Sequence, residues 1–280
     1  MARHIKNSNT ESQLAKYTLI FLGVSFMAVI VMLPIIAVFA EAFRKGFDAY
    51  IEGINEEYAI SAIKLTLLVA GIAVPFNVMF GLVASWSIAK FEFKGKHLLI
   101  TFIDLPFSVS PVISGLIYVL LFGAHSILGN WLIENNIQII FAVPGLVIAT
   151  IFVTFPFVAR ELIPLMQEQG TEEEEASILL GASGLQTFMK VTLPNIKWGL
   201  LYGVLLCNAR AMGEFGAVSV VSGHIKGDTN TIPLHVEILF NEYNFVAAFA
   251  VASILTFLAI ITLIIKSILE KKYTRKIDRH

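Results

Sequence analysis

The sequence predicts an all-α membrane protein with six transmembrane helices. Of its 280 residues, 56% are hydrophobic and only 15% are charged, and the mean hydropathy is +0.77. Soluble chains carry about 25% charged residues. A helix that crosses a bilayer needs roughly 17–25 consecutive residues that are mostly apolar. Six stretches meet or approach that length: residues 18–40, 65–89, 98–122, 137–159, 198–222 and 245–265.

The first stretch resembles a signal peptide, because positive residues precede it and Val38-Phe39-Ala40 has the form of a cleavage site. Its uncharged run is too long for that reading, so we expect it to be retained as the first helix. The third stretch carries Asp104, and the fifth carries Arg210 and Glu214. Charges inside a span are costly, and they make these two stretches the chemically interesting ones.

The distribution of Lys and Arg predicts the orientation, because positive residues are retained on the cytoplasmic side. With both ends of the chain inside, the cytoplasmic segments hold fifteen of the twenty, and the outer loops hold Arg44, Lys45 and Lys226. The sequence therefore predicts cytoplasmic N and C termini, with an N-terminal tail at 1–17 and a basic tail at 266–280.

Composition and motifs exclude several classes of function. A net charge of −1 with no basic block disfavours a nucleic-acid partner. A single cysteine, Cys207, forms no internal disulfide and no cysteine-based metal framework. The patterns H-E-x-x-H and G-x-S-x-G are absent, so we expect no catalytic residue and no metal site. The phosphate-binding pattern G-x-x-x-x-G-K-[ST] is absent too, so any ATP must be bound by another chain.

The segment from Arg160 to Lys197 is predicted to be a structured cytoplasmic loop. Thr171 precedes four consecutive glutamates, which predicts a helix that begins with Thr171 as N-cap and ends or turns at Gly181. A second short amphipathic helix is expected from about Leu185 until Pro194 stops it.

The order of residues in this loop resembles the EAA loop of ABC-importer membrane subunits. It reads Glu175-Ala176-Ser177, three residues, Gly181, nine residues, and then Val191-Thr192-Leu193-Pro194. Ser177 and Val191 depart from the family pattern, each by a change that is conservative in size. Residues 104–115, 154–164 and 208–223 are similar to the sulfate/thiosulfate and molybdate permeases within that group.

This resemblance implies the ABC importer type I permease fold in a bacterial inner membrane. It implies import of sulfate or thiosulfate together with a second homologous permease subunit, two copies of a cytoplasmic ATPase and a periplasmic sulfate/thiosulfate-binding protein. ATP and Mg would be bound by the ATPase, so no cofactor is expected in this chain. The loop residues implied to couple to the ATPase are Glu175, Ala176, Ser177, Gly181, Leu193 and Pro194.

Two alternatives remain open beside that function. One is a molybdate or tungstate permease, because sulfate and molybdate are both tetrahedral dianions. The other is a secondary transporter driven by an ion gradient, which usually needs inverted repeats and more than six spans in one chain.

Arg210 and Glu214 are the first candidates for a pore or gate. They are four residues apart, which puts them on one helical face within reach of a salt bridge. Gly199, Gly203, Cys207 and Ala217 extend this face as a stripe of small residues, which is expected to pack against another helix or to line a cavity. The pair either pins two helices together or attracts a dianion, and we favour gating and packing.

The prolines of the third stretch supply the other candidates. Ser110-Pro111 has the form of a helix start, and a helix that restarts there would direct unpaired N–H groups into the pore. Ser108, Ser110 and Ser114 add hydroxyl donors. The alternative is a simple proline kink with serines bonded back to the helix. Asp104 is expected near the cytoplasmic interface, where it repels anions or caps a loop.

Two segments predicted to lie outside are candidates for contact with a substrate-delivering protein. Residues 224–233 form a polar loop before the short apolar run 234–240, and ordinary packing is the alternative for them. Residues 41–57 are acidic and are expected to be exposed.

Overall fold

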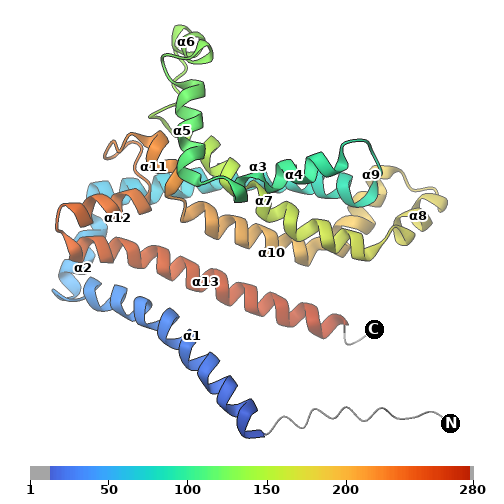
Figure 1. The fold of residues 1–280 in the computed structure, drawn as a ribbon, viewed down its shortest axis with the longest axis horizontal. Coiled ribbons are helices and arrows are strands. Elements are labelled where there is room, and N and C mark those ends of the chain that lie inside the picture. Colours follow the sequence, from blue (N-terminus) through green and yellow to red (C-terminus); the bar gives the residue numbers. More distant parts are fainter. Residues whose placement is uncertain (1–12, 278–280) are drawn as a thin grey trace.

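The computed structural model describes residues 13–277, and in that range it contains only helices (Figure 1). Four helices are long and apolar enough to cross a membrane: α1 (Gln13–Ala42), α3 (Glu57–Lys90), α7 (Val143–Gln169) and α13 (Phe245–Ile277). Two bent pairs raise the number of spans to as many as six. The all-α prediction is therefore confirmed. The cytoplasmic placement of the termini stays a prediction, and residues 1–12 and 278–280 of the predicted tails lie outside the described residues.

The first bent pair confirms the predicted helix start at Ser110-Pro111 and shows that the span predicted at 98–122 is broken there. Helices α4 (Lys96–Ser108) and α5 (Pro111–Phe122) meet at an angle of 106°. Proline has no N–H to bond the preceding turn, and it pushes the residue before it into extended backbone. Ser110 accordingly has ψ 134°, and α5 starts afresh at Pro111. Pro106 lies inside α4, which continues through it.

The second bent pair corrects the expectation at 198–222. Three consecutive segments form one helix from Gly184 to Met212: α9 (Gly184–Thr187), the π-helical η1 (Phe188–Thr192) and α10 (Leu193–Met212). After a break at residues 213–215, α11 (Gly216–Ser222) continues at 47°.

Pro194 does not stop the second helix of the predicted loop, contrary to the sequence prediction. It lies in the first turn of α10, where the missing N–H costs little. The wider π-helical turn at 188–192 directly precedes it and changes the hydrogen-bond register of the helix at that point. The chain therefore passes from the loop into the span without interruption.

Helix α7 also differs from its predicted span of 137–159. It begins at Val143, with Pro144 in its first turn, and it continues to Gln169. The first ten residues of the predicted loop thus extend this span as a rigid helix.

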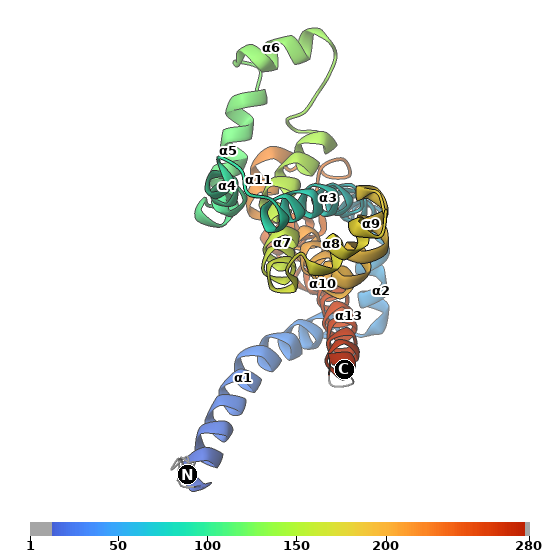
Figure 2. The ribbon, with the colours of Figure 1, turned by 90° about the vertical axis from the view of Figure 1, so that its right-hand side faces the viewer.

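Helices α3, α7 and α10 pack together as the central core. Their contact surface buries apolar residues from all three helices, including Val74, Val158, Leu162, Ile196 and Cys207. Helix α13 covers the other side of α10, and α1 diverges from the bundle with its most apolar stretch unburied (Figures 1 and 2).

A polar cluster crosses the middle of this core. Asn77 of α3 donates through Nδ2 to Thr154 Oγ1 of α7 at 2.7 Å, and Thr154 Oγ1 donates to the Thr150 carbonyl at 2.7 Å. Cys207 of α10 contacts the Thr154 carbonyl at 3.6 Å, and all of these residues are fully buried. Between transmembrane helices such hydrogen bonds add to van der Waals packing, so the cluster fixes the register of the three helices.

The ends of the spans that the sequence predicts to lie outside carry two short helices. Helix α12 (Ile232–Asn241) buries Leu239 against α3 and α13, and it buries Leu234 in a second cluster with α3, α7 and α11, so packing explains the apolar run at 234–240. The acidic segment 41–57 is not a plain loop, because it contains α2 (Phe47–Asn55), which Tyr50 ties to Ser253 of α13 at 3.1 Å. Helices α6 (Ile127–Glu134) and α8 (Glu172–Leu179) complete the fold.

Glycine allows α3 and α7 to approach closely at one position, and this can be tested. A Cβ on Gly81 would lie 2.9 Å from Val158 Cβ, whereas a Cβ on Gly71 of the same helix would meet nothing within 4 Å. We expect Gly81→Ala to destabilise the purified protein by about 1–3 kcal/mol through overpacking. The matched control Gly71→Ala should be neutral or stabilising by up to about 1 kcal/mol. Thermal unfolding in detergent measures both, and equal midpoints for the two variants would contradict the close packing.

Candidate functional site

The candidate site has two parts: the loop that joins α7 to α9, here called the coupling loop (residues 170–183), and the break between α10 and α11. In the loop, Thr171 occupies the N-cap position of α8, as predicted, but it makes a different bond. Its hydroxyl donates to Glu175 Oε1 at 2.7 Å and accepts no backbone N–H. Glu175 is therefore held by its own helix, with its side chain on the surface.

Gly181 turns the chain after α8, as predicted. Its φ of +91° lies in the left-handed region, where a side chain would be strained. The turn is closed by the Gly181 N–H to the Ile178 carbonyl at 2.9 Å and the Ala182 N–H to the Ser177 carbonyl at 3.1 Å. The loop is also tied to α9, because the hydroxyls of Ser177 and Thr187 are 3.1 Å apart.

The remaining residues of the motif have different surroundings. Ala176 is exposed on α8, where a methyl group leaves the surface flat. Leu193 is half-buried against the central core, and Pro194 follows it at the start of α10. The structure thus places one part of the motif on the loop surface and the other at the junction with a span.

Glu174 anchors the coupling loop, a role that the sequence did not indicate. Its carboxylate pairs with Lys90 Nζ at the end of α3 at 2.8 Å and accepts the Thr192 hydroxyl at 2.8 Å. Lys90 also donates to the Gly170 carbonyl, and its side chain is only 6% exposed. Nothing distinguishes Glu174 among four consecutive glutamates, and its partner lies 84 residues away, so no local signal could have revealed this contact.

An apolar surface covers the tip of the coupling loop. Leu179 and Leu180 are 87% and 89% exposed, and Leu185 is 74% exposed. Ile178 and Met189 extend this surface. Exposed apolar patches of this kind mark sites of contact with another protein or with a membrane.

The second part of the site is a carboxylate that joins two helices. Glu214 lies beyond the end of α10 and is 1% exposed. Its Oε2 pairs with Arg210 Nη1 at 2.6 Å, and its Oε1 accepts the Ala217 N–H of α11 at 2.9 Å. The predicted salt bridge is confirmed, although Glu214 lies in the break and not on the helical face. The Arg210 side chain remains 33% exposed.

The stripe of small residues packs against other helices. A Cβ on Gly203 would contact Val158 of α7, and a Cβ on Gly199 would collide with Leu165. Cys207 belongs to the buried core, and Ala217 backs onto Gly115 of α5. The packing interpretation of this stripe is therefore confirmed.

The break in α10–α11 touches the break in α4–α5. A Cβ on Gly216 would lie 3.0 Å from Pro111 Cβ and 3.6 Å from the Val112 nitrogen. The start of α5 therefore lies directly against the segment that Glu214 caps. Ser114 bonds back to the Ser110 carbonyl at 3.2 Å, as the kink alternative expected, whereas Ser108 and Ser110 are exposed.

Asp104 is paired, which corrects both roles expected for it. Arg160 of α7 donates through Nε to Asp104 Oδ1 at 2.8 Å, and its guanidinium lies 4.8 Å from the centre of the Phe107 ring. The Asp104 carboxylate therefore neutralises Arg160, the residue at which the predicted cytoplasmic loop begins. Within residues 13–277, no group of three His, Cys, Asp or Glu side chains could hold a metal ion.

Comparison with known proteins gives consistent matches along the chain. Residues 77–275 match the family model described as binding-protein-dependent transport system inner membrane component. The sulfate transport system permease protein CysW of Escherichia coli (strain K12) is 52% identical over 255 residues, which cover 91% of this chain and 88% of that protein. CysW of a Synechocystis species is 53% identical, covering 92% and 93%.

A more distant relative and a solved structure extend the comparison. The sulfate permease CysT of E. coli is 34% identical, covering 91% of this chain and 92% of that protein. A bacterial alginate ABC transporter, solved in complex with an alginate-bound periplasmic protein, matches with a TM-score of 0.75. That match covers 94% of this chain and 95% of the solved chain at 18% identity, and so supports the fold alone.

The anchor of the coupling loop yields a prediction. Glu174→Gln removes the charge that holds Lys90, and hydrogen bonds to charged groups contribute about 1.5–3 kcal/mol. We expect hydrogen exchange of backbone amides in residues 171–192 to become roughly tenfold faster or more. Glu172→Gln, on the exposed side of the same helix, is the matched control. Equal exchange rates in the two variants would show that the anchor does not hold the loop.

Proposed function

Because the chain belongs to the family of binding-protein-dependent transport system inner membrane components, we propose that it is the permease subunit through which an ABC importer moves sulfate. One observation supports this function most strongly: about half of the residues are identical to those of CysW proteins, over more than nine-tenths of the chain. The chain is a membrane subunit and lies in the cytoplasmic membrane. Thiosulfate is a further substrate in this proposal.

Energy for transport comes from partner chains in this proposal. Two copies of a cytoplasmic ATPase bind ATP and Mg, and one of them docks on the coupling loop of this chain. The apolar tip around Leu179 and Leu180 supplies the contact surface, and Gly181 lets the chain turn tightly beneath it. Glu175 lies on the same short helix, where it can pair with a basic group of the ATPase.

Closure of the ATPases is passed to the pore through rigid contacts. Glu174 ties the loop to α3 through Lys90 and to the α9–α10 helix through Thr192. That helix continues without interruption to Met212, next to the break capped by Glu214. Movement at the loop can therefore change the angle at the break.

Sulfate would pass close to the two touching breaks. A periplasmic binding protein delivers the dianion at the outer face, and a second, homologous permease completes the pore. The first turn of α5 offers backbone N–H groups, with the hydroxyls of Ser108 and Ser110 beside them. Arg210 adds a cation whose charge Glu214 partly offsets, so this pair serves as a gate more than as a tight site.

Uptake of labelled sulfate tests the proposed function. In cells lacking this chain, uptake should be lost, and restoring the chain should recover it with little inhibition by excess molybdate. Depleting ATP should abolish uptake, whereas collapsing the proton gradient should not. Sulfate uptake that does not depend on the chain, with molybdate accumulation lost instead, would assign it to molybdate transport. Dependence on the ion gradient alone would favour a secondary transporter.

Arg210 allows the gate to be tested separately. Arg210→Gln leaves the Glu214 carboxylate buried without a charged partner, which costs more than a lost neutral hydrogen bond. We expect sulfate uptake, normalised to the amount of permease in the membrane, to fall about tenfold or more. Arg210→Lys keeps the charge without the planar fork and should give an intermediate rate. Wild-type uptake by Arg210→Gln would remove this residue from the mechanism.

A further inference from the structure

Residues 111–142 form an arm that leaves the bundle sideways. The arm consists of α5, α6 and the segment that returns to α7 (Figures 1 and 2). Both views show α5 rising across the direction of α3, α7 and α10, with α6 at the tip. Since α5 is turned by 106° from α4, it makes no progress toward the outer surface.

The depth of the arm follows from the length of α4. This helix begins at Lys96 and has 13 residues, so its far end lies about 20 Å from its start. The hydrocarbon layer is about 30 Å thick, and the bend therefore lies within it. The arm extends from that depth parallel to the membrane plane.

The base of the arm is firmly held. A Cβ on Gly115 would lie 2.7 Å from the Ala217 carbonyl oxygen, so α5 is in close contact with α11. The Phe141 N–H donates to the Val221 carbonyl at 2.8 Å, which fixes the returning segment to the same helix. The direction of the arm is thus set by packing at both of its ends.

Neither lipid nor water suits the surface of the arm. Residues 123–126 and 135–142 are not helical, and irregular backbone at membrane depth is tolerated only where protein or a water-filled cavity covers it. The tip also exposes polar and charged side chains: His125, Asn130, Glu134, Asn135, Asn136 and Gln138. Ile127 and Leu120, in contrast, are 94% and 75% exposed and would not remain in water.

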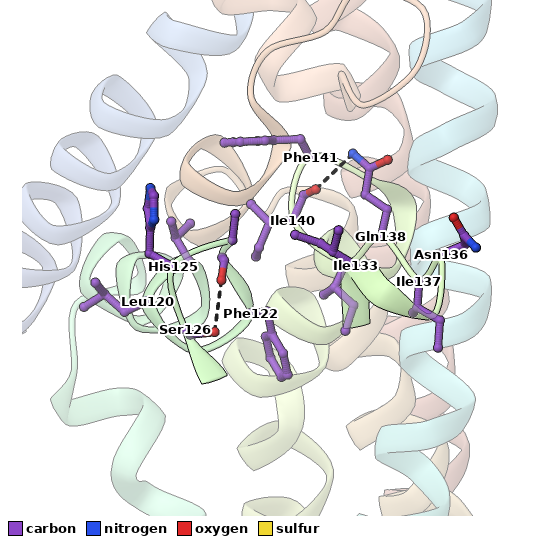
Figure 3. Close-up of a pocket in the computed structure, with 14 residues that line it drawn as sticks. Leu120, Phe122, His125, Ser126, Ile133, Asn136, Ile137, Gln138, Ile140 and Phe141 are labelled. Atoms are coloured by element: carbon purple, nitrogen blue, oxygen red, sulfur yellow. Dashed lines mark hydrogen bonds between the residues drawn. The ribbon is translucent and has the colours of Figure 1, made fainter. Parts of the chain in front are cut away.

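A cavity on the arm has the size and the apolar lining needed to accept side chains of another protein. Its volume is about 770 Å³, and it lies between the end of α5 and the returning segment (Figure 3). Leu120, Phe122, Ile133, Ile137 and Phe141 make its walls largely apolar. His125, Ser126 and Gln138 add polar groups, of which Ser126 already caps α6 through the Gly129 N–H at 2.8 Å.

The direction of the arm indicates which kind of protein it can contact. A periplasmic protein docks at the outer ends of the spans and an ATPase at their inner ends, along the direction of the helices. The arm points at right angles to that direction, so the chain it reaches must lie beside this one in the bilayer. We infer that the arm embraces the homologous permease subunit, whose side chains fill the cavity. This inference rests on the proposed function, which supplies such a subunit.

Photocrosslinking in membranes that contain the whole transporter tests this inference. A photoreactive amino acid at Ile127 or Trp131 should crosslink to the homologous permease, identified by mass spectrometry. The same probe at Leu180 in the coupling loop is the control and should crosslink to the ATPase. Crosslinks from the arm to lipid only, to the binding protein, to the ATPase or to a second copy of this chain would each overturn the inference.

Co-purification gives a second measurement that does not depend on the probe. The double variant I127D/L120D should reduce recovery of the homologous permease about tenfold or more and retain the ATPase. L180D should show the reverse pattern. Sulfate uptake by the unmodified chain tests the proposed function independently. If that uptake depends on the chain while the arm variant retains its permease partner, the inference fails and the proposed function stands.

Discussion

Inside a bilayer, every backbone N–H and C=O that leaves a helix must find a partner within protein, and this constraint determines where the fold can be interrupted. The chain breaks two of its spans, at 109–110 and at 213–215, and the two helices that start after the breaks touch each other. Gly216 touches the first turn of α5, and the buried Glu214 carboxylate accepts the Ala217 N–H at the start of α11. The same carboxylate pairs with Arg210, so a charged group lies at the second break, next to close-packed helices.

The rest of the molecule connects that region to the coupling loop. Asn77, Thr154 and Cys207 fix α3, α7 and α10 to one another at mid-span, so these helices respond as a unit. Glu174 then fastens the coupling loop to the same unit. The segment from residue 184 to residue 212 is a single helix, so a displacement at the loop tip is transmitted along it with little bending. The break at 213–215 is the first position on this path where the backbone can change direction.

The sequence predicted what depends on local pattern. Apolar runs marked the spans, the glutamate run after Thr171 marked α8, and Gly181 marked the turn after it. Spacing alone predicted the Arg210–Glu214 pair. Contacts between distant segments could not be predicted in this way, because the partners of Glu174 and Asp104 lie 84 and 56 residues away. The effect of Pro194 was also misjudged, because the π-helical turn that precedes it has no clear sequence signal.

In the proposed pore, partial neutralisation of Arg210 has a physical purpose. A transporter must bind its substrate well enough to admit it and weakly enough to release it. An unpaired guanidinium in a low-dielectric pore would hold a dianion strongly and would itself be costly to bury. Pairing with Glu214 lowers the free-energy cost of burying Arg210 and also weakens its attraction for the dianion. About a third of the Arg210 side chain stays exposed, so some of its N–H donors remain accessible. Because the same carboxylate caps α11, a change of angle at the break would also alter how much of the Arg210 charge the pore experiences.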